Sequence, residues 1–124
     1  MARILCVDDE PEALKLKCLI LSGAGHSVTP AVSAADAIEK LKSESYDAVV
    51  TDWRLKVKHG HVIEDGHAVV AAAKDQANVP VVVVSGYVSE AFQAAEPVAD
   101  LYLNKPVDPR ELVTIVEELL KKHE

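Results

Sequence analysis

Residues 47–53 read DAVVTDW, an apolar run that stops abruptly at a carboxylate, and this pattern decides the fold. A short run of valines without polar alternation is typical of a parallel strand that is covered on both faces. Runs of similar length recur at regular intervals along the chain. They predict five strands, over residues 3–7, 27–32, 47–51, 79–85 and 100–104.

Helical patterns alternate with these runs. Ser33 and Asp36 form a variant of the capping box at the start of one helix, and Asp108 with Pro109 begins another. The predicted helices cover residues 11–22, 34–42, 66–77, 88–96 and 108–122. Strands that alternate with helices imply right-handed crossovers and a parallel sheet with helices on both faces. We therefore expect one doubly wound α/β domain over residues 1–124.

The composition is that of a soluble globular domain, and it limits the possible functions. Of the 124 residues, 49% are hydrophobic and 27% are charged, and neither a membrane span nor a signal peptide is recognisable. The net charge of -7 argues against direct binding to nucleic acid or to an acidic membrane surface. Cys6 and Cys18 lack metal-motif spacing and are interpreted as buried hydrophobic residues, which fits a reducing cytoplasm.

Polar residues interrupt the apolar runs where the strands end. In an open parallel sheet, ligands bind at the carboxyl ends of the strands, so these residues are expected to converge on one rim. They are Asp8 and Asp9 after the first strand, Asp52 after the third, Ser85 after the fourth and Lys105 just past the fifth.

Three carboxylates in a small space repel one another and suit a hard divalent cation such as Mg²⁺, which would relieve the repulsion. A lysine ammonium and a serine hydroxyl opposite them are suitable partners for phosphoryl oxygens. A carboxylate can also be the nucleophile in phosphoryl transfer, giving an aspartyl phosphate. The set of residues therefore indicates phosphoryl chemistry at this rim.

Four segments together resemble the receiver domain of two-component response regulators, a CheY-like domain: CVDDE (6–10), DAVVTDW (47–53), VVVVSG (81–86) and LYLNKP (101–106). The resemblance extends over essentially the whole chain. It implies a flavodoxin-like fold, with a five-stranded parallel sheet in the order 2-1-3-4-5 flanked by five helices. It also implies a cytoplasmic phosphorylation-dependent signalling switch, which assists its own phosphorylation and dephosphorylation but is not an enzyme acting on an external substrate.

The resemblance also assigns the phosphoacceptor and the metal ligands. Asp52 would accept a phosphoryl group from a sensor histidine kinase or a histidine phosphotransfer protein. Asp9 would hold Mg²⁺ directly together with Asp52, and Asp8 would act through water or through contacts with the ligands. The backbone carbonyl of Arg54 would be a further ligand.

Further roles follow from the same resemblance. Lys105 would pair with Asp52 and then with the phosphoryl group, and the peptide bond between Lys105 and Pro106 would be cis. Ser85 and Tyr102 would form the switch pair. The large side chains of Arg54 and Tyr87 would shield the phosphoryl group from water.

The chain departs from the family pattern in the loop over residues 53–65. This loop has no proline and separates Asp52 from Gly66 by thirteen residues, so we infer an insertion at the rim of the site. It is either a tolerated surface loop or a lid or partner-docking element. His59, His61 and His67, with Glu64 and Asp65, raise the possibility of a zinc site, but the group lacks a convincing fourth ligand.

Two other functions stay open. One is a receiver-like module that binds proteins without being phosphorylated. The other is a haloacid-dehalogenase-like phosphatase, which would need an Asp-x-Asp arrangement on the first strand, whereas Asp8 and Asp9 are adjacent. For a switch, we expect output through contact of the 88–122 face with a downstream protein, in a stand-alone protein or an excised domain. The sequence identifies neither the kinase nor the oligomeric state.

Overall fold

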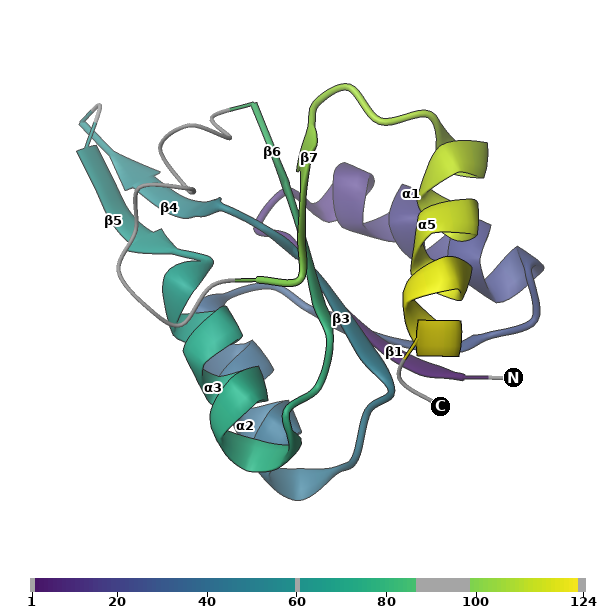
Figure 1. The fold of residues 1–124 in the computed structure, drawn as a ribbon. Coiled ribbons are helices and arrows are strands. Elements are labelled where there is room, and N and C mark those ends of the chain that lie inside the picture. The colour runs from purple at the N-terminus through teal and green to yellow at the C-terminus, as the bar shows by residue number, and fades with distance from the viewer. Residues whose placement is uncertain (1, 60, 87–98, 123–124) are drawn as a thin grey trace.

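A five-stranded parallel sheet forms the centre of the domain, in a computed structural model that describes residues 2–59, 61–86 and 99–122 (Figure 1). The strand order is β2-β1-β3-β6-β7, and each neighbouring pair is parallel. The strands are β1 (Arg3–Val7), β2 (Ser27–Ala31), β3 (Ala48–Asp52), β6 (Val81–Ser85) and β7 (Leu101–Asn104). Counted along this sheet alone, the order is 2-1-3-4-5, so the predicted flavodoxin-like topology is confirmed.

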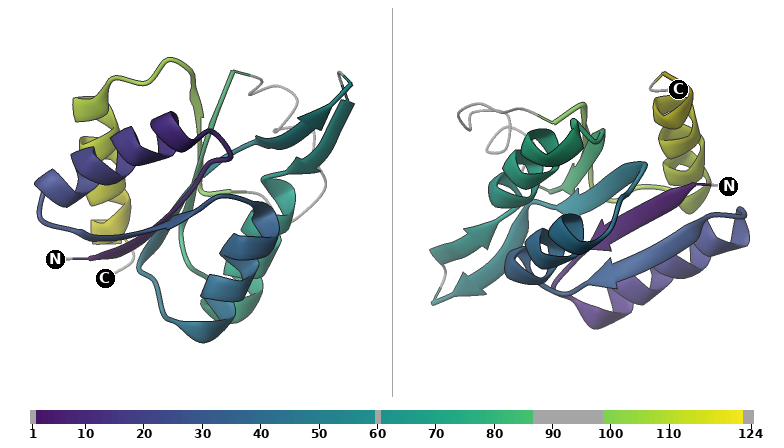
Figure 2. Two further views of the ribbon diagram at one scale, coloured as in Figure 1. Left: turned by 180° about the vertical axis from the view of Figure 1, so that it is seen from behind. Right: turned by 90° about the horizontal axis from the view of Figure 1, so that it is seen from below.

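Helices cover both faces of the sheet. The pair α1 and α5 packs on one face, and the pair α2 and α3 packs on the other (Figures 1 and 2). The bounds are α1 (Pro11–Gly23), α2 (Ala34–Ser43), α3 (His67–Ala77) and α5 (Pro109–Lys122). Four of the five predicted helices are thereby confirmed, and the predicted helix over 88–96 lies outside the described residues. The described helices all fall short, in length or in apolar character, of what a bilayer crossing requires.

The apolar strands are buried on both faces because alternate side chains point to opposite sides of the sheet. On β1, Leu5 and Val7 belong to the core under α2 and α3, whereas Ile4 and Cys6 belong to the core under α1 and α5. All four side chains are fully buried. Burying a Val, Leu or Ile side chain is worth roughly 1.5–3 kcal/mol, so the continuous apolar runs are explained by two cores. The central strands β3 and β6 alternate in the same way.

Two helices begin where their capping residues predicted. The Ser33 Oγ accepts a hydrogen bond from the Asp36 backbone N–H at 3.0 Å at the start of α2. At the start of α5, the Asp108 carboxylate accepts from the Arg110 backbone N–H at 2.8 Å. These bonds satisfy N–H groups that have no partner inside a helix, which fixes where each helix begins.

The prediction of a loop over residues 53–65 is wrong. The chain forms an antiparallel hairpin there, β4 (Arg54–Lys58) and β5 (His61–Asp65), which makes a separate two-stranded sheet (Figure 1). His59, at the tip, has a left-handed backbone with φ of 52°. Within the two strands only the backbone and the Leu55 side chain are described. The insertion is therefore regular structure that continues directly from the central strand β3.

The base of the hairpin is anchored in the core under α2 and α3. Trp53 and Leu55 are 4% and 1% exposed and pack in that core. The Gly66 backbone N–H donates to the Trp53 carbonyl at 2.6 Å, which closes the base. A Cβ on Gly66 would lie 2.7 Å from the Asp52 carbonyl oxygen, so only glycine fits without a shift of the backbone.

We predict that Gly66→Ala destabilises the domain by about 1–3 kcal/mol, because the added methyl group overpacks the hairpin base. The measurement is urea-induced unfolding followed by Trp53 fluorescence. Gly23→Ala is the matched control, because a Cβ at Gly23 meets nothing within 4 Å. Equal unfolding midpoints for Gly66→Ala and the unmodified protein would contradict the close approach at the hairpin base.

Candidate functional site

The predicted polar residues meet at the carboxyl edge of the sheet. Asp8 directly follows β1, Asp52 ends β3, Ser85 ends β6 and Lys105 directly follows β7. Parallel pairing sets Asp52 beside Val84 and Ser85 beside Asn104, so the ends of the three strands β3, β6 and β7 are level. The fold thus brings together residues that are far apart in the sequence.

Three carboxylates form a compact cluster at this edge. One oxygen from each of Asp8, Asp9 and Asp52 lies within 4.8 Å of the others, the one such group of three metal-ligating side chains in the described part of the chain. Asp8 and Asp52 are 1% and 7% exposed, and Asp9 is exposed. Hard carboxylate oxygens at this separation suit Mg²⁺, which takes one or two carboxylates and keeps water on its other sites.

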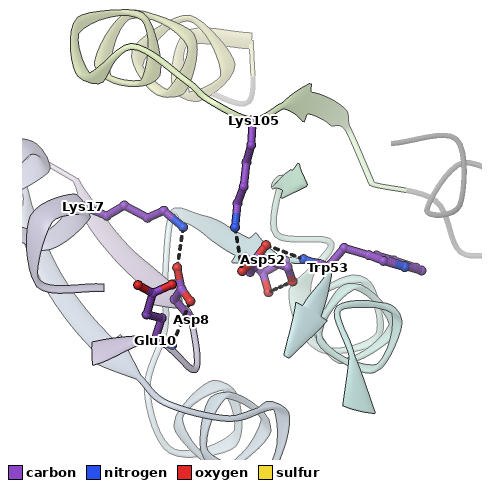
Figure 3. Close-up of polar contacts among 7 residues, drawn as sticks. Asp8, Glu10, Lys17, Asp52, Trp53 and Lys105 are labelled. Atoms are coloured by element: carbon purple, nitrogen blue, oxygen red, sulfur yellow. Dashed lines mark hydrogen bonds and ion pairs between the residues drawn. The ribbon is translucent and has the colours of Figure 1, made fainter. Parts of the chain in front are cut away.

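Each oxygen of the Asp52 carboxylate is held by a donor (Figure 3). Lys105 Nζ lies 2.9 Å from Oδ2, and the Trp53 backbone N–H donates to Oδ1 at 3.0 Å. Lys105 is itself positioned by its backbone N–H, which donates to the Ser85 carbonyl at 3.0 Å. The peptide bond between Lys105 and Pro106 is cis. The carboxylate is therefore fixed in orientation with a cation against it.

Asp8 has a partner that sequence reasoning missed. Lys17 Nζ, from α1, lies 2.9 Å from Asp8 Oδ2, and the Glu10 backbone N–H donates to Oδ1 at 3.0 Å. The signal was present, because Lys17 lies three residues after Leu14 and four before Leu21, on the buried stripe of α1. A charged residue on an apolar stripe, facing an acidic cluster, predicts an ion pair.

The pKa of the Asp9 carboxyl is raised above its ordinary value. Partial burial raises the pKa of its carboxyl, and the nearby Asp8 and Asp52 carboxylates raise it further. Both causes disfavour the ionised form. A cation bound beside Asp9 would favour its ionised form.

The predicted switch residues lie on neighbouring strands, Ser85 on β6 and Tyr102 on β7. Ser85 is 1% exposed at the end of β6. The Tyr102 ring packs partly buried against the core under α2 and α3, and its hydroxyl accepts a hydrogen bond from the Ala99 backbone N–H at 2.9 Å. Arg54 begins β4 two residues after Asp52, and its carbonyl stays a predicted ligand. Tyr87 lies outside the described residues, so the predicted shielding stays a prediction.

The proposed zinc group is divided between the hairpin and α3. His67 begins α3, and its ring meets the Trp53 ring edge-on at a centroid distance of 6.4 Å. His59 lies at the hairpin tip. The side chains of His61, Glu64 and Asp65 lie outside the described part, so a zinc site stays a prediction.

Comparison with known proteins connects this geometry with a family. The model of the response regulator receiver domain matches residues 4–117. The chain is 31% identical over 123 residues to the transcriptional regulatory protein GlrR of Escherichia coli (strain K12), covering 98% of this chain but only 27% of GlrR. The chain therefore spans about a quarter of that relative's length.

Solved structures are similar over the whole domain. A CheY-like receiver domain protein from Methanospirillum hungatei has a TM-score of 0.86 and 27% identity, covering 98% of this chain and 95% of that one. The response regulator TrrA from Thermotoga maritima, solved in complex with Mg²⁺-BeF, has a TM-score of 0.82 and 26% identity, covering 96% and 99%.

The raised pKa of Asp9 predicts how stability depends on pH in the metal-free protein. Because the native state holds the Asp9 proton more tightly than the unfolded chain does, stability is lost as the pH rises through the native pKa. Asp9→Asn should therefore melt at a higher temperature than the unmodified protein at pH 7. The difference should shrink as the pH falls to about 4, near the ordinary Asp pKa.

Thermal unfolding in a metal chelator, followed by circular dichroism, measures this difference. Asp75→Asn is the control, because it removes one exposed carboxylate from α3, away from the cluster. A melting temperature for Asp9→Asn that equals or falls below that of the unmodified protein at pH 7 would contradict the prediction. It would show that the ionised Asp9 carboxylate does not destabilise the native state.

Proposed function

The chain belongs to the response regulator receiver domain family, and on that premise we propose that Asp52 is the phosphoacceptor of a two-component signalling switch. The observation that carries the proposal is the position of Asp52. Its carboxylate is buried at the end of the central strand β3, within 4.8 Å of two further carboxylates and 2.9 Å from Lys105 Nζ. A carboxylate nucleophile needs this combination of fixed orientation and nearby positive charge.

Asp9 and Asp52 would hold Mg²⁺ directly, with the Arg54 carbonyl as a further ligand, and Asp8 would act through water or through contacts with the ligands. The donor set supports this, because three carboxylate oxygens converge within 4.8 Å. TrrA, similar to this chain over nearly its whole length, was solved with Mg²⁺-BeF. When bound, the ion would neutralise charge that develops on the transferring phosphoryl group.

The chain's own residues would position and neutralise the phosphoryl group. The Trp53 backbone N–H holds Asp52 Oδ1, which fixes the orientation of the carboxylate. Lys105 has a 41% exposed side chain and can move from Asp52 to a phosphoryl oxygen when the aspartyl phosphate forms. Ser85 would then donate its hydroxyl to a phosphoryl oxygen, and Tyr102 would change its ring position in response.

The phosphoryl donor would be a sensor histidine kinase or a histidine phosphotransfer protein in the cytoplasm. The output would be contact with a downstream protein through the 88–122 face. The described part of this face includes β7 and α5, and Leu101 on β7 is 37% exposed. Tyr102 also lies on β7, so a change at the switch pair has a short route to this surface.

The phosphoacceptor is tested by incubating the protein with Mg²⁺ and acetyl phosphate and measuring its intact mass. We expect one phosphoryl adduct on the unmodified protein and on Asp75→Asn, and none on Asp52→Asn. An adduct that persists in Asp52→Asn would place the acceptor elsewhere. Failure of the unmodified protein to form an adduct would favour a module that binds partners without phosphorylation.

Lys105 is tested by the rate of the same reaction. Lys105→Gln should slow adduct formation by about 10²-fold, because a preorganised positive charge at the developing phosphoryl charge is lost. Lys121→Gln removes an exposed lysine from the last turn of α5 and should leave the rate unchanged. Equal rates for the two variants would show that Lys105 has no part in the transfer.

A further inference from the structure

Lys17 reaches the acidic cluster from α1, whereas Lys105 reaches it from the segment after β7 (Figure 3). The two ion pairs differ in exposure. The side chains of Lys17 and Asp8 are 13% and 1% exposed, against 41% and 10% for Lys105 and Asp52. Lys105 can leave its carboxylate for solvent or a phosphoryl oxygen, whereas Lys17 lies largely buried beside Asp8 in the metal-free protein.

Burial gives the Lys17–Asp8 pair a larger influence on the cluster than an exposed pair would have. Solvent and salt screen a buried pair weakly, and removal of one partner leaves an uncompensated buried charge. The second oxygen of Asp8 accepts a hydrogen bond from the Glu10 backbone N–H. Both oxygens of Asp8 are thus engaged inside the protein, and one of them is engaged by a full positive charge.

The charge of the cluster follows from these contacts. The carboxylates of Asp8, Asp9 and Asp52 contribute three negative charges, and the ammonium groups of Lys17 and Lys105 contribute two positive charges. Without Lys17, the net charge of the cluster would be twice as negative, at minus two in place of minus one. Because a divalent cation is attracted by this net charge, Lys17 opposes its binding.

We propose that Lys17 is a built-in counter-cation of Asp8 that sets the affinity of the acidic cluster for a divalent cation. In the metal-free protein it neutralises the most buried carboxylate of the cluster. A cation that binds at the cluster competes with the Lys17 ammonium for Asp8. The cation therefore binds more weakly than it would to the three carboxylates alone. The inference rests on the proposed function, in that it takes this cluster as the Mg²⁺ site.

The test is a Mg²⁺ titration without any phosphoryl donor, followed by Trp53 fluorescence and by the rise in the thermal unfolding midpoint. Lys17→Gln removes the charge but keeps a hydrogen-bond donor for Asp8, and its Kd for Mg²⁺ should fall about tenfold. Lys17→Arg keeps the charge and should stay close to the unmodified protein. Lys15→Gln is the matched control, because Lys15 is exposed on the same helix and its loss changes the net charge equally.

The outcomes separate this inference from the proposed function. Equal Kd values for Lys17→Gln and Lys15→Gln, with Mg²⁺ bound by the unmodified protein, would overturn the inference and leave the proposed function intact. Failure of the unmodified protein to bind Mg²⁺ would overturn both.

A measurement on the unmodified protein covers the case in which Lys17→Gln does not fold. Acetic anhydride modifies lysine amines that are free, and peptide mass spectrometry reports the rate at each lysine. Saturating Mg²⁺ should speed modification of Lys17, which the cation releases from Asp8, and leave Lys15 unchanged. An unchanged rate at Lys17 would overturn the inference.

Discussion

Burial of like charges at one edge of the sheet is the constraint on which the rest of the site depends. Asp8 and Asp52 are almost fully buried, and a buried carboxylate without a partner is strongly unfavourable. The fold provides one lysine for each, Lys17 from α1 and Lys105 after β7. Asp9, exposed and with a raised pKa, is left as the carboxylate without a lysine of its own within the described contacts.

The hairpin β4–β5 shows how the domain accepts an insertion beside this edge without disturbing it. A two-stranded hairpin alone is marginally stable in water, so it needs packing at its base. Trp53 and Leu55 supply that packing in the core under α2 and α3, and Gly66 lets the chain return close to the Asp52 carbonyl. The same tryptophan fixes Asp52 through its backbone N–H, so the hairpin base and the site share one residue.

The sequence predicted what depends on local pattern and on the geometry of parallel sheets. Apolar runs predicted the five strands, and polar residues at their ends predicted that Asp52 and Lys105 would lie at one edge of the sheet. The Lys17–Asp8 pair was missed because the stripe on α1 was interpreted from its apolar members alone. The hairpin was missed because RLKVK (54–58), which alternates, and HVIED (61–65), which does not, were interpreted together as one loop. Both outcomes depend on contacts between segments, which a local pattern indicates only weakly.

A crystal structure of this chain grown with Mg²⁺ and beryllofluoride, which mimics a phosphoryl group on a carboxylate, tests the central claim most directly. The claim is that the strand ends assemble one site for a divalent cation and a phosphoryl group. We predict a metal ion bound to Asp9 and Asp52, with beryllofluoride on Asp52 and Lys105 in contact with it. Density for neither ligand at this edge, or beryllofluoride on another carboxylate, would contradict the claim.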